Sequence, residues 1–177
     1  MIVINIICSV IASLIFLFII LFFLKPSINI CPFICKGKVE FDNDTIYHSF
    51  KIVNQSWFSA FDIKLELYEL RKYPIPPNGA MNTRYTSIAL ILNTISKIPP
   101  YRPVCMRKEV IQAIRIRTSI DIEELLKDPN VSVQLEVSLR HGLTGLTKVF
   151  KVDYCDISEV KKGKFTYGTK FDYIKCK

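Results

Sequence analysis

The chain has 177 residues, of which half are hydrophobic and 23% are charged, and its formal net charge is +8. The part after residue 24, about 150 residues, fits one domain with a real hydrophobic core, which excludes two independent domains without a visible linker. The sequence contains two histidines and six cysteines but no paired C-x2-C motif, which argues against a zinc site. We therefore expect no metal and no cofactor.

The first 24 residues predict a transmembrane helix. Residues 1–24 contain no charged side chain, and residues 2–24 are almost wholly apolar. A helix of that length spans roughly 34 Å, against a hydrocarbon core of about 30 Å. A cleaved signal peptide is the alternative, but Met1 to Asn5 lack a basic residue and Phe22-Phe23-Leu24 offers no small-residue cleavage motif. We expect an uncleaved anchor that contacts the lipid bilayer through residues 2–24.

The residues that flank the anchor predict its orientation. Lys25, Lys36 and Lys38 follow the helix, whereas only the α-amino group precedes it. The positive-inside rule places the C-terminal domain in the cytoplasm, although long domains can translocate regardless of charge, which leaves an extracytoplasmic domain as the alternative. One of the six cysteines, Cys8, lies inside the anchor, so an odd number remains outside it. Free, mostly buried thiols in a reducing compartment agree with the cytoplasmic orientation.

Residues 25–35 are predicted to be a connector, because Pro26 and Pro32 prevent the helix from continuing. From residue 36 onward, apolar and polar residues alternate with the period of strands. We expect strands at residues 47–53, 60–70, 84–92, 110–118, 131–139, 146–154, 165–167 and 171–174, with loops at 74–82 and 99–103. One short helix is predicted at residues 121–128, with Asp121 as its N-cap and Glu124 as the reciprocal partner.

The predicted fold class is mainly β. Short strands with Pro, Gly and Asn turns indicate that residues 36–177 form an antiparallel, immunoglobulin-like β-sandwich with one short helix. The Cys…Trp…Cys pattern of antibody domains is missing, because Trp57 lies in a predicted turn without a suitably spaced cysteine pair. The prediction therefore concerns the architecture and not a function.

Catalysis has little support in the sequence. No G-x-S-x-G, H-E-x-x-H or P-loop motif occurs. His48 falls in a predicted strand, where a packed histidine is the default. His141 precedes Gly142 in a predicted loop, and a hydrolase in which it faces Asp153 or Asp156 is the less favoured alternative. We expect a protein that is not an enzyme.

Four lysines near the C-terminus form the candidate contact surface. Lys161, Lys162 and Lys164 flank a glycine in a predicted turn, and Lys170 follows. These lysines are explained by a solvent-exposed turn, and the more specific alternative is a contact with anionic lipid headgroups or with a protein partner. Nucleic acid is not expected, since the aromatic residues occur at the spacing of core positions in strands.

One local string resembles a known class of domain. Residues 140–145, Arg-His-Gly-Leu-Thr-Gly, together with Val149, Phe150 and Tyr154, are similar to β-sandwich domains that follow the pore in some bacterial potassium-channel-like proteins. This chain has no T-x-G-Y-G filter, so the resemblance implies a membrane-linked module without conduction. The predicted function is a membrane-anchored, non-enzymatic binding or structural module, with a regulatory domain acting at an anionic membrane surface or on a channel-like partner as the alternative.

Overall fold

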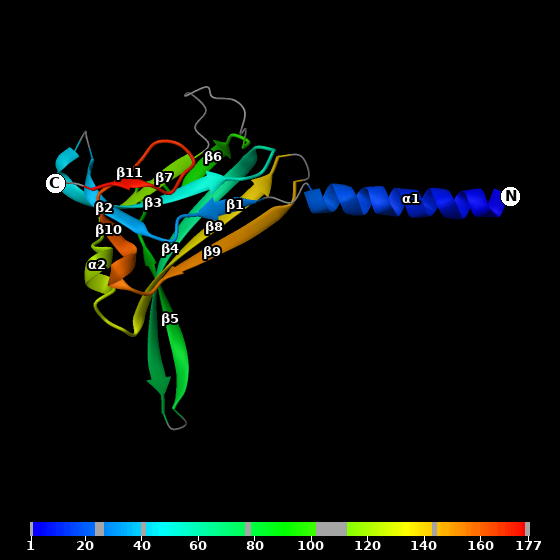
Figure 1. Cartoon of the computed structure of the whole chain (residues 1–177). Coiled ribbons are helices and arrows are strands. Elements are labelled where there is room, and N and C mark those ends of the chain that lie inside the picture. Colours follow the sequence, from blue (N-terminus) through cyan, green and yellow to red (C-terminus); the bar gives the residue numbers. More distant parts are fainter. Residues whose placement is uncertain are drawn as a thin grey trace.

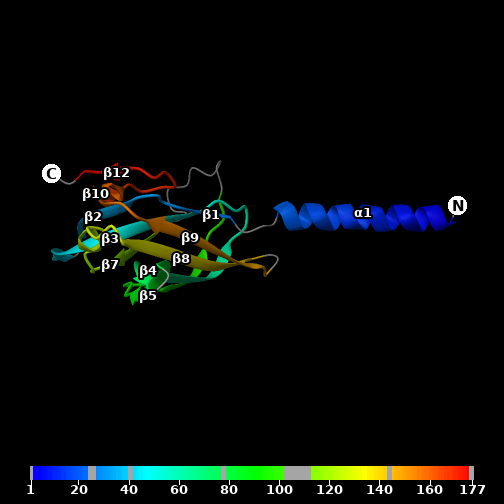
Figure 2. The ribbon, with the colours of Figure 1, turned by 90° about the horizontal axis from the view of Figure 1, so that it is seen from below.

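The computed structural model describes residues 2–23, 27–39, 42–76, 79–101, 113–142 and 145–175. Helix α1 (Ile2–Phe23) projects from a β domain as a separate rod, with the N-terminus at its far tip (Figure 1 and Figure 2). Its 22 residues span about 33 Å. The stretch Ile2–Leu21 has a mean hydropathy of 2.9 and none of it is buried in the protein. The predicted N-terminal helix is therefore confirmed as one that is long and apolar enough to cross a membrane, and it is not a core helix of the β domain.

The first sheet is built around one long strand. It contains β1 (Ile28–Ile30), β2 (Ile34–Val39), β3 (Asp42–Asn54), β7 (Ala113–Thr118) and β10 (Val160–Lys162). Strand β3 pairs with β1 and β2 along one edge and with β7 along the other, and all of these pairs are antiparallel. Strand β10 pairs with β2 in parallel, which places Val160 opposite Ile34.

The second sheet is antiparallel throughout. It contains β4 (Ala60–Ile75), β5 (Ala80–Ile88), β6 (Thr94–Ile98), β8 (Val131–His141) and β9 (Thr147–Tyr154). Strand β4 pairs with β8 on one edge and with β5 and β6 on the other, and β9 lies beyond β8. The remaining elements are the short pair β11 (Lys164–Phe165) and β12 (Tyr173–Ile174), the helix α2 (Ile122–Leu125) and the 3-10 turn η1 (Ile157–Glu159).

The two sheets share one hydrophobic core. Alternate residues of β4 and β8 point inward, and they pack against apolar residues of β3 and β7. The ring of Tyr154 lies 5.6 Å from the ring of Phe50, centroid to centroid, and joins the second sheet to the first. The Tyr154 hydroxyl donates a hydrogen bond of 2.7 Å to the backbone carbonyl of Cys31. The predicted mainly β class, with one N-terminal apolar helix and one short second helix, is confirmed.

Several predicted boundaries are wrong. The segment expected as a connector, residues 25–35, contains β1 and the start of β2, so the sandwich begins at Ile28 and not at residue 36. Most described residues of the loop expected at 74–82 belong to the ends of β4 and β5. Strands β6 and β10 were not predicted. Residues 110–112 of an expected strand lie outside the described residues.

Helix α2 forms where the sequence predicts a helix, but it is shorter. The Asp121 side chain accepts hydrogen bonds from the backbone N–H groups of Glu123 and Glu124, which confirms the N-cap. The Glu124 carboxylate lies against the Lys127 ammonium instead of returning to the cap. The chain leaves the helix after one turn, just before Pro129.

Candidate functional site

The end of the β4–β5 hairpin projects beyond the rest of the sandwich (Figure 1). Strand β8 pairs with β4 only as far as Arg71, opposite Val131. Residues 72–75 of β4 pair with residues 80–83 of β5, and no other described strand borders them. We call residues 70–76 and 79–85 the ribbon. Its unsupported strands extend about 13 Å beyond the sheet, at ~3.3 Å per residue.

Both faces of the ribbon carry apolar side chains in solvent. Met81 and Tyr85 lie on one face and are 60% and 59% exposed. Tyr73 and Ile75 lie on the other face and are about two-fifths exposed. A ribbon that packed only to complete its own fold would leave polar residues at these positions, and exposed apolar groups gathered on one projection are typical of binding surfaces.

The ribbon is also basic. No acidic residue occurs between Glu69 and Glu109. Arg71 is neutralised, because its guanidinium lies 3.1 Å from Glu69 and 3.4 Å from Asp128. Lys72 and Arg84 have no ion-pair partner within the described residues, so the ribbon presents their charges to solvent. Pro74 has no N–H, so it interrupts the row of donors along the unpaired edge of β4 in the ribbon.

The four lysines predicted as a contact surface lie away from the ribbon. Lys161 and Lys162 are on β10, Lys164 is on β11 and Lys170 lies between β11 and β12. Lys162 and Lys170 are exposed, whereas Lys161 and Lys164 are half-buried. Lys162 sits opposite Lys36, at the level of His48 on β3. That level is six residues, or about 20 Å, from the end of β3 that adjoins the entry of the chain from α1.

The structure places His141 at the end of a strand and buries its side chain. It is the last residue of β8, opposite Ala60, and not a loop residue as expected. Its side chain is buried, with the ring edge-on to Phe58 at 5.3 Å, and burial lowers its pKa. Asp153 is opposite Gln134, whose amide donates to it at 2.6 Å, and Asp156 caps η1. The expectation that either carboxylate faces His141 is therefore wrong.

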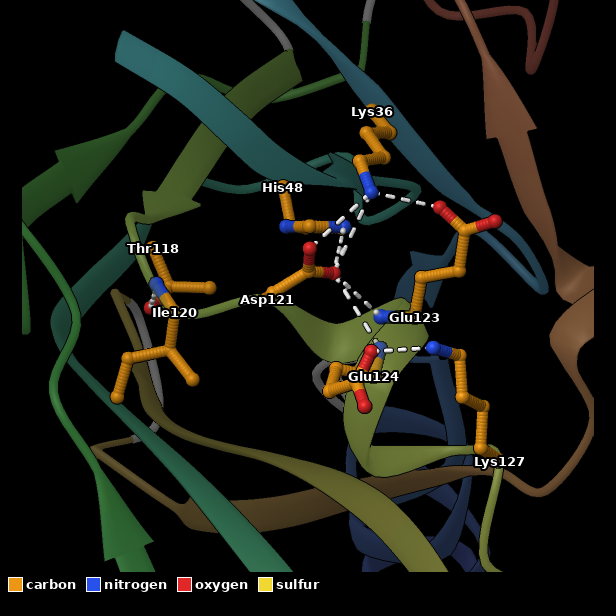
Figure 3. Close-up of polar contacts among 8 residues, drawn as sticks. All are labelled: Lys36, His48, Thr118, Ile120, Asp121, Glu123, Glu124 and Lys127. Atoms are coloured by element: carbon orange, nitrogen blue, oxygen red, sulfur yellow. Dashed lines mark hydrogen bonds and ion pairs between the residues drawn. The ribbon is translucent and has the colours of Figure 1, made fainter.

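His48 belongs to a polar cluster that joins β2, β3 and the start of α2 (Figure 3). Its Nε2 atom lies 3.6 Å from an Asp121 carboxylate oxygen, and the Lys36 ammonium lies 3.2 Å from Asp121 and 2.6 Å from Glu123. Burial lowers the pKa of His48, and the nearby Asp121 charge opposes this only in part. Burial works to raise the pKa of Asp121, but hydrogen bonds from Lys36 and the backbone outweigh it and the pKa is lowered. The cluster holds a neutral histidine beside a carboxylate that already caps a helix, which is a structural arrangement.

A shallow cleft of about 520 Å³ lies on the outer side of the second sheet. Asp62, on its wall, has a φ of 49° at the point where the pairing of β4 shifts register. Aspartate is one of the few residues that tolerates this left-handed conformation. Its carboxylate lies 2.6 Å from the Arg140 guanidinium, but both side chains are more than half exposed, so the pair contributes little to stability. Sequence alternation gives no signal for this bulge.

The C-terminal segment is fastened to the first sheet by a buried lysine. The Lys51 ammonium donates to the backbone carbonyls of Thr166, at 2.9 Å, and Lys170, at 2.6 Å, and its side chain is almost fully buried. Burial, and then the charge of Arg115, lower the pKa of Lys51. Cys31 lies close by, and burial raises the pKa of its thiol to about 11. The thiol is thus protonated at neutral pH, which makes it a poor nucleophile.

The cysteines and the acidic residues form no metal centre in the described part of the chain. Among the described residues, no three His, Cys, Asp or Glu side chains lie close enough together to hold a metal ion. Of the described cysteines, Cys31 and Cys35 are buried, and Cys8 and Cys155 are exposed. Cys105 and Cys176 lie outside the described residues. Among the described residues, the ribbon is the strongest candidate for a contact surface.

Compared with the models of known protein families and with curated proteins, the sequence matches none.

Proposed function

We propose that this protein is a membrane-anchored, non-enzymatic binding module. In this proposal α1 spans the bilayer, the sandwich lies in the cytoplasm and the ribbon contacts a protein partner. The single observation that supports it is the ribbon, which carries four large apolar side chains in solvent at the end of an otherwise well-packed domain. The resemblance of residues 140–154 to channel-linked sandwich domains implies one form of it, an immunoglobulin-like regulatory domain that acts on a channel-like partner.

The chemistry of the ribbon defines the partner surface. Met81 and Tyr85 would fill an apolar depression, while Lys72 on the same face of the ribbon and Arg84 on the opposite face would meet acidic residues around it. Buried aromatic anchors supply most of the affinity in such interfaces, and charges at the rim accelerate association and select the partner. The cationic ribbon disfavours a second copy of this chain as the partner, because the whole protein carries a net charge of +8.

Site-specific photocrosslinking tests the proposal. The full chain is expressed in its host membranes with a photoreactive amino acid at Met81 or, as the control, at Ile174, which is similarly exposed but lies on β12. We expect a discrete adduct from position 81 that position 174 does not give. Lys72→Glu together with Arg84→Glu should reduce that adduct several-fold.

Two results would contradict the proposal. The first is that position 81 gives no adduct, or gives the same adducts as position 174. The second is that the purified protein hydrolyses ester, peptide or phosphoester substrates and His141→Ala abolishes the turnover.

A further inference from the structure

The loop between β3 and β4, residues 55–59, lies at the end of the domain that faces α1 (Figure 1). Three hydrogen bonds fasten it to Ser27, the first described residue after α1. The Gln55 N–H donates to the Ser27 carbonyl at 2.9 Å, and the Ser27 N–H donates to the Ser56 hydroxyl at 2.7 Å. The Ser56 hydroxyl in turn donates to the Ser27 carbonyl at 3.2 Å. The position of this loop is therefore fixed relative to the point where the chain enters the domain.

The length of chain between α1 and Ser27 limits how far this loop can lie from a bilayer. Helix α1 ends at Phe23, and four residue steps separate Phe23 from Ser27. Four steps span at most about 14 Å when fully extended. A helix of about 33 Å that crosses a hydrocarbon core of ~30 Å ends at the inner boundary of the headgroup layer. Whatever the tilt of the domain, Ser27 and the loop bonded to it stay at or just above the headgroups.

Trp57 is at the tip of this loop. It is the one tryptophan of the chain, and its side chain is 82% exposed. Tryptophan is enriched at membrane–water interfaces, where its apolar ring and its N–H group suit the headgroup layer. If the Trp57 ring stayed in water, its large hydrophobic surface would remain unburied.

Two further loops surround the loop of Trp57. The Gly142 N–H donates to the Ser59 carbonyl at 3.0 Å, which holds the β8–β9 connection and its exposed Leu146 at the same end. The Tyr101 N–H donates to the Ser56 carbonyl at 2.8 Å. Residues 55–59, 99–101 and 145–146 contain no acidic side chain that anionic headgroups would repel. Trp57 and Leu146 present exposed apolar side chains at this end of the domain, as contact with a lipid surface requires.

We propose that Trp57 and Leu146 insert into the headgroup layer of the bilayer that α1 spans. The inference rests on the proposed function, because it requires α1 to be a retained anchor. It adds a second membrane contact, which would orient the domain so that the Asn54 end of β3 lies near the lipid and the Asp42 end lies away from it. The contact is formed by the end of the domain next to α1 and not by the lysines of β10 and β11, which lie about 20 Å further along β3.

The fluorescence of the chain's own tryptophan tests this inference. The full chain is reconstituted in phosphatidylcholine vesicles with or without lipid brominated near the headgroup. The matched control is Trp57→Phe combined with Ile46→Trp, because Ile46 is 47% exposed and lies eight residues, or about 26 Å, from the Asn54 end of β3. Both proteins should show the same strand-rich circular dichroism, since both positions are on the surface.

We expect a blue-shifted emission from the wild-type protein, several-fold stronger quenching by the brominated lipid than in the control, and weaker quenching by aqueous iodide than in the control. Equal quenching of the two proteins by the brominated lipid, in vesicles that carry the protein on flotation, would overturn the inference and leave the anchor intact. Failure of the wild-type protein to float with the vesicles would overturn the anchor itself, and the inference with it.

Discussion

Replacing Tyr154 with phenylalanine should destabilise the sandwich by removing one buried hydrogen bond between its sheets. The phenol of Tyr154, on β9, donates to the backbone carbonyl of Cys31 at 2.7 Å, and both residues are fully shielded from water. Burial raises the pKa of Tyr154 far above its usual value, so the hydroxyl remains a donor throughout the accessible pH range. Tyr154→Phe keeps the ring that packs against Phe50 and removes only this donor.

The expected loss in the free energy of unfolding follows from the burial of the Cys31 carbonyl, which loses its hydrogen-bond donor. A buried polar group left without a partner costs about 1–3 kcal/mol, because water cannot reach it to replace the lost bond. Cys31 has no exposed surface, so we expect a loss near the middle of this range, about 2 kcal/mol. That loss lowers the folding equilibrium constant by roughly thirty-fold. With a urea m-value of about 2 kcal/mol/M, the unfolding midpoint falls by about 1 M.

Urea unfolding of the full chain in detergent micelles, followed by the strand signal in circular dichroism, measures this shift. Tyr167→Phe is the matched control, because Tyr167 is 84% exposed and its hydroxyl exchanges partners freely with water. The control midpoint should agree with the wild type to within about 0.3 M, since surface substitutions change stability by at most ~0.5 kcal/mol. If Tyr154→Phe moves the midpoint no more than Tyr167→Phe does, the bond between Tyr154 and Cys31 does not stabilise the fold.

Two further predictions concern the polar cluster at α2. Because burial lowers the pKa of His48, the unfolded chain binds a proton more readily than the folded one, and stability is lost as pH falls through the ordinary histidine pKa of 6.5. The urea midpoint should therefore be lower at pH 5 than at pH 7. His48→Gln should reduce this difference, and the double variant with His141→Gln should reduce it most. An unchanged difference in the double variant would refute the explanation by buried histidines. Asp121→Ala should lower stability by about 1 kcal/mol through loss of the helix cap, and Asp121→Asn, which can still cap, should lower it less. Equal losses in the two Asp121 variants would show that the charge facing Lys36 matters and the cap does not.

The long strands could be predicted from the sequence because their two faces differ. From Val131 to Leu139 every second residue is apolar, and the structure buries those residues between the sheets. The N-cap of α2 was also predictable, since Asp121 acts on backbone groups only two and three residues away. The N-terminal helix could be predicted from its length and apolar composition alone. Each of these signals is local, and each is confirmed.

The missed elements depend on contacts between distant residues. Strands β1, β6 and β10 have three to five residues each, too few to show a period, and they exist because longer strands provide their hydrogen-bond partners. The sequence does not indicate that Lys51 is buried, since its position fits the polar face of a strand. Its ammonium is accommodated only because residues 166 and 170 bring two carbonyls to it. The sequence predicts a loop at residues 74–82 of this hairpin, because Pro and Gly residues are typical of turns.

The two candidate contact surfaces differ in how much of them the sequence shows. The charges of lysines 161, 162, 164 and 170 are concentrated in the sequence, so a contact surface there can be predicted, and it stays a prediction. The apolar residues of the ribbon give no such signal, since an exposed tyrosine and a core tyrosine look alike without the structure. Trp57 was correctly placed in a turn, but its nearness to α1 depends on the hydrogen bonds of Ser27. A binding site made of exposed apolar side chains can be recognised only once the structure shows which apolar side chains are buried.

The parallel pairing of β10 with β2 has a consequence for how the protein is made. Strand β2 begins at Ile34, whereas β10, which covers its edge, begins at Val160, so these two paired strands are far apart in the chain. Every strand of the second sheet is therefore translated before the strand that covers β2 leaves the ribosome. Throughout that time the nascent chain presents an uncovered sheet edge that neighbouring nascent chains can pair with. A premature stop codon just before Val160 would make this exposure permanent, so we expect such truncated chains to aggregate or to be degraded.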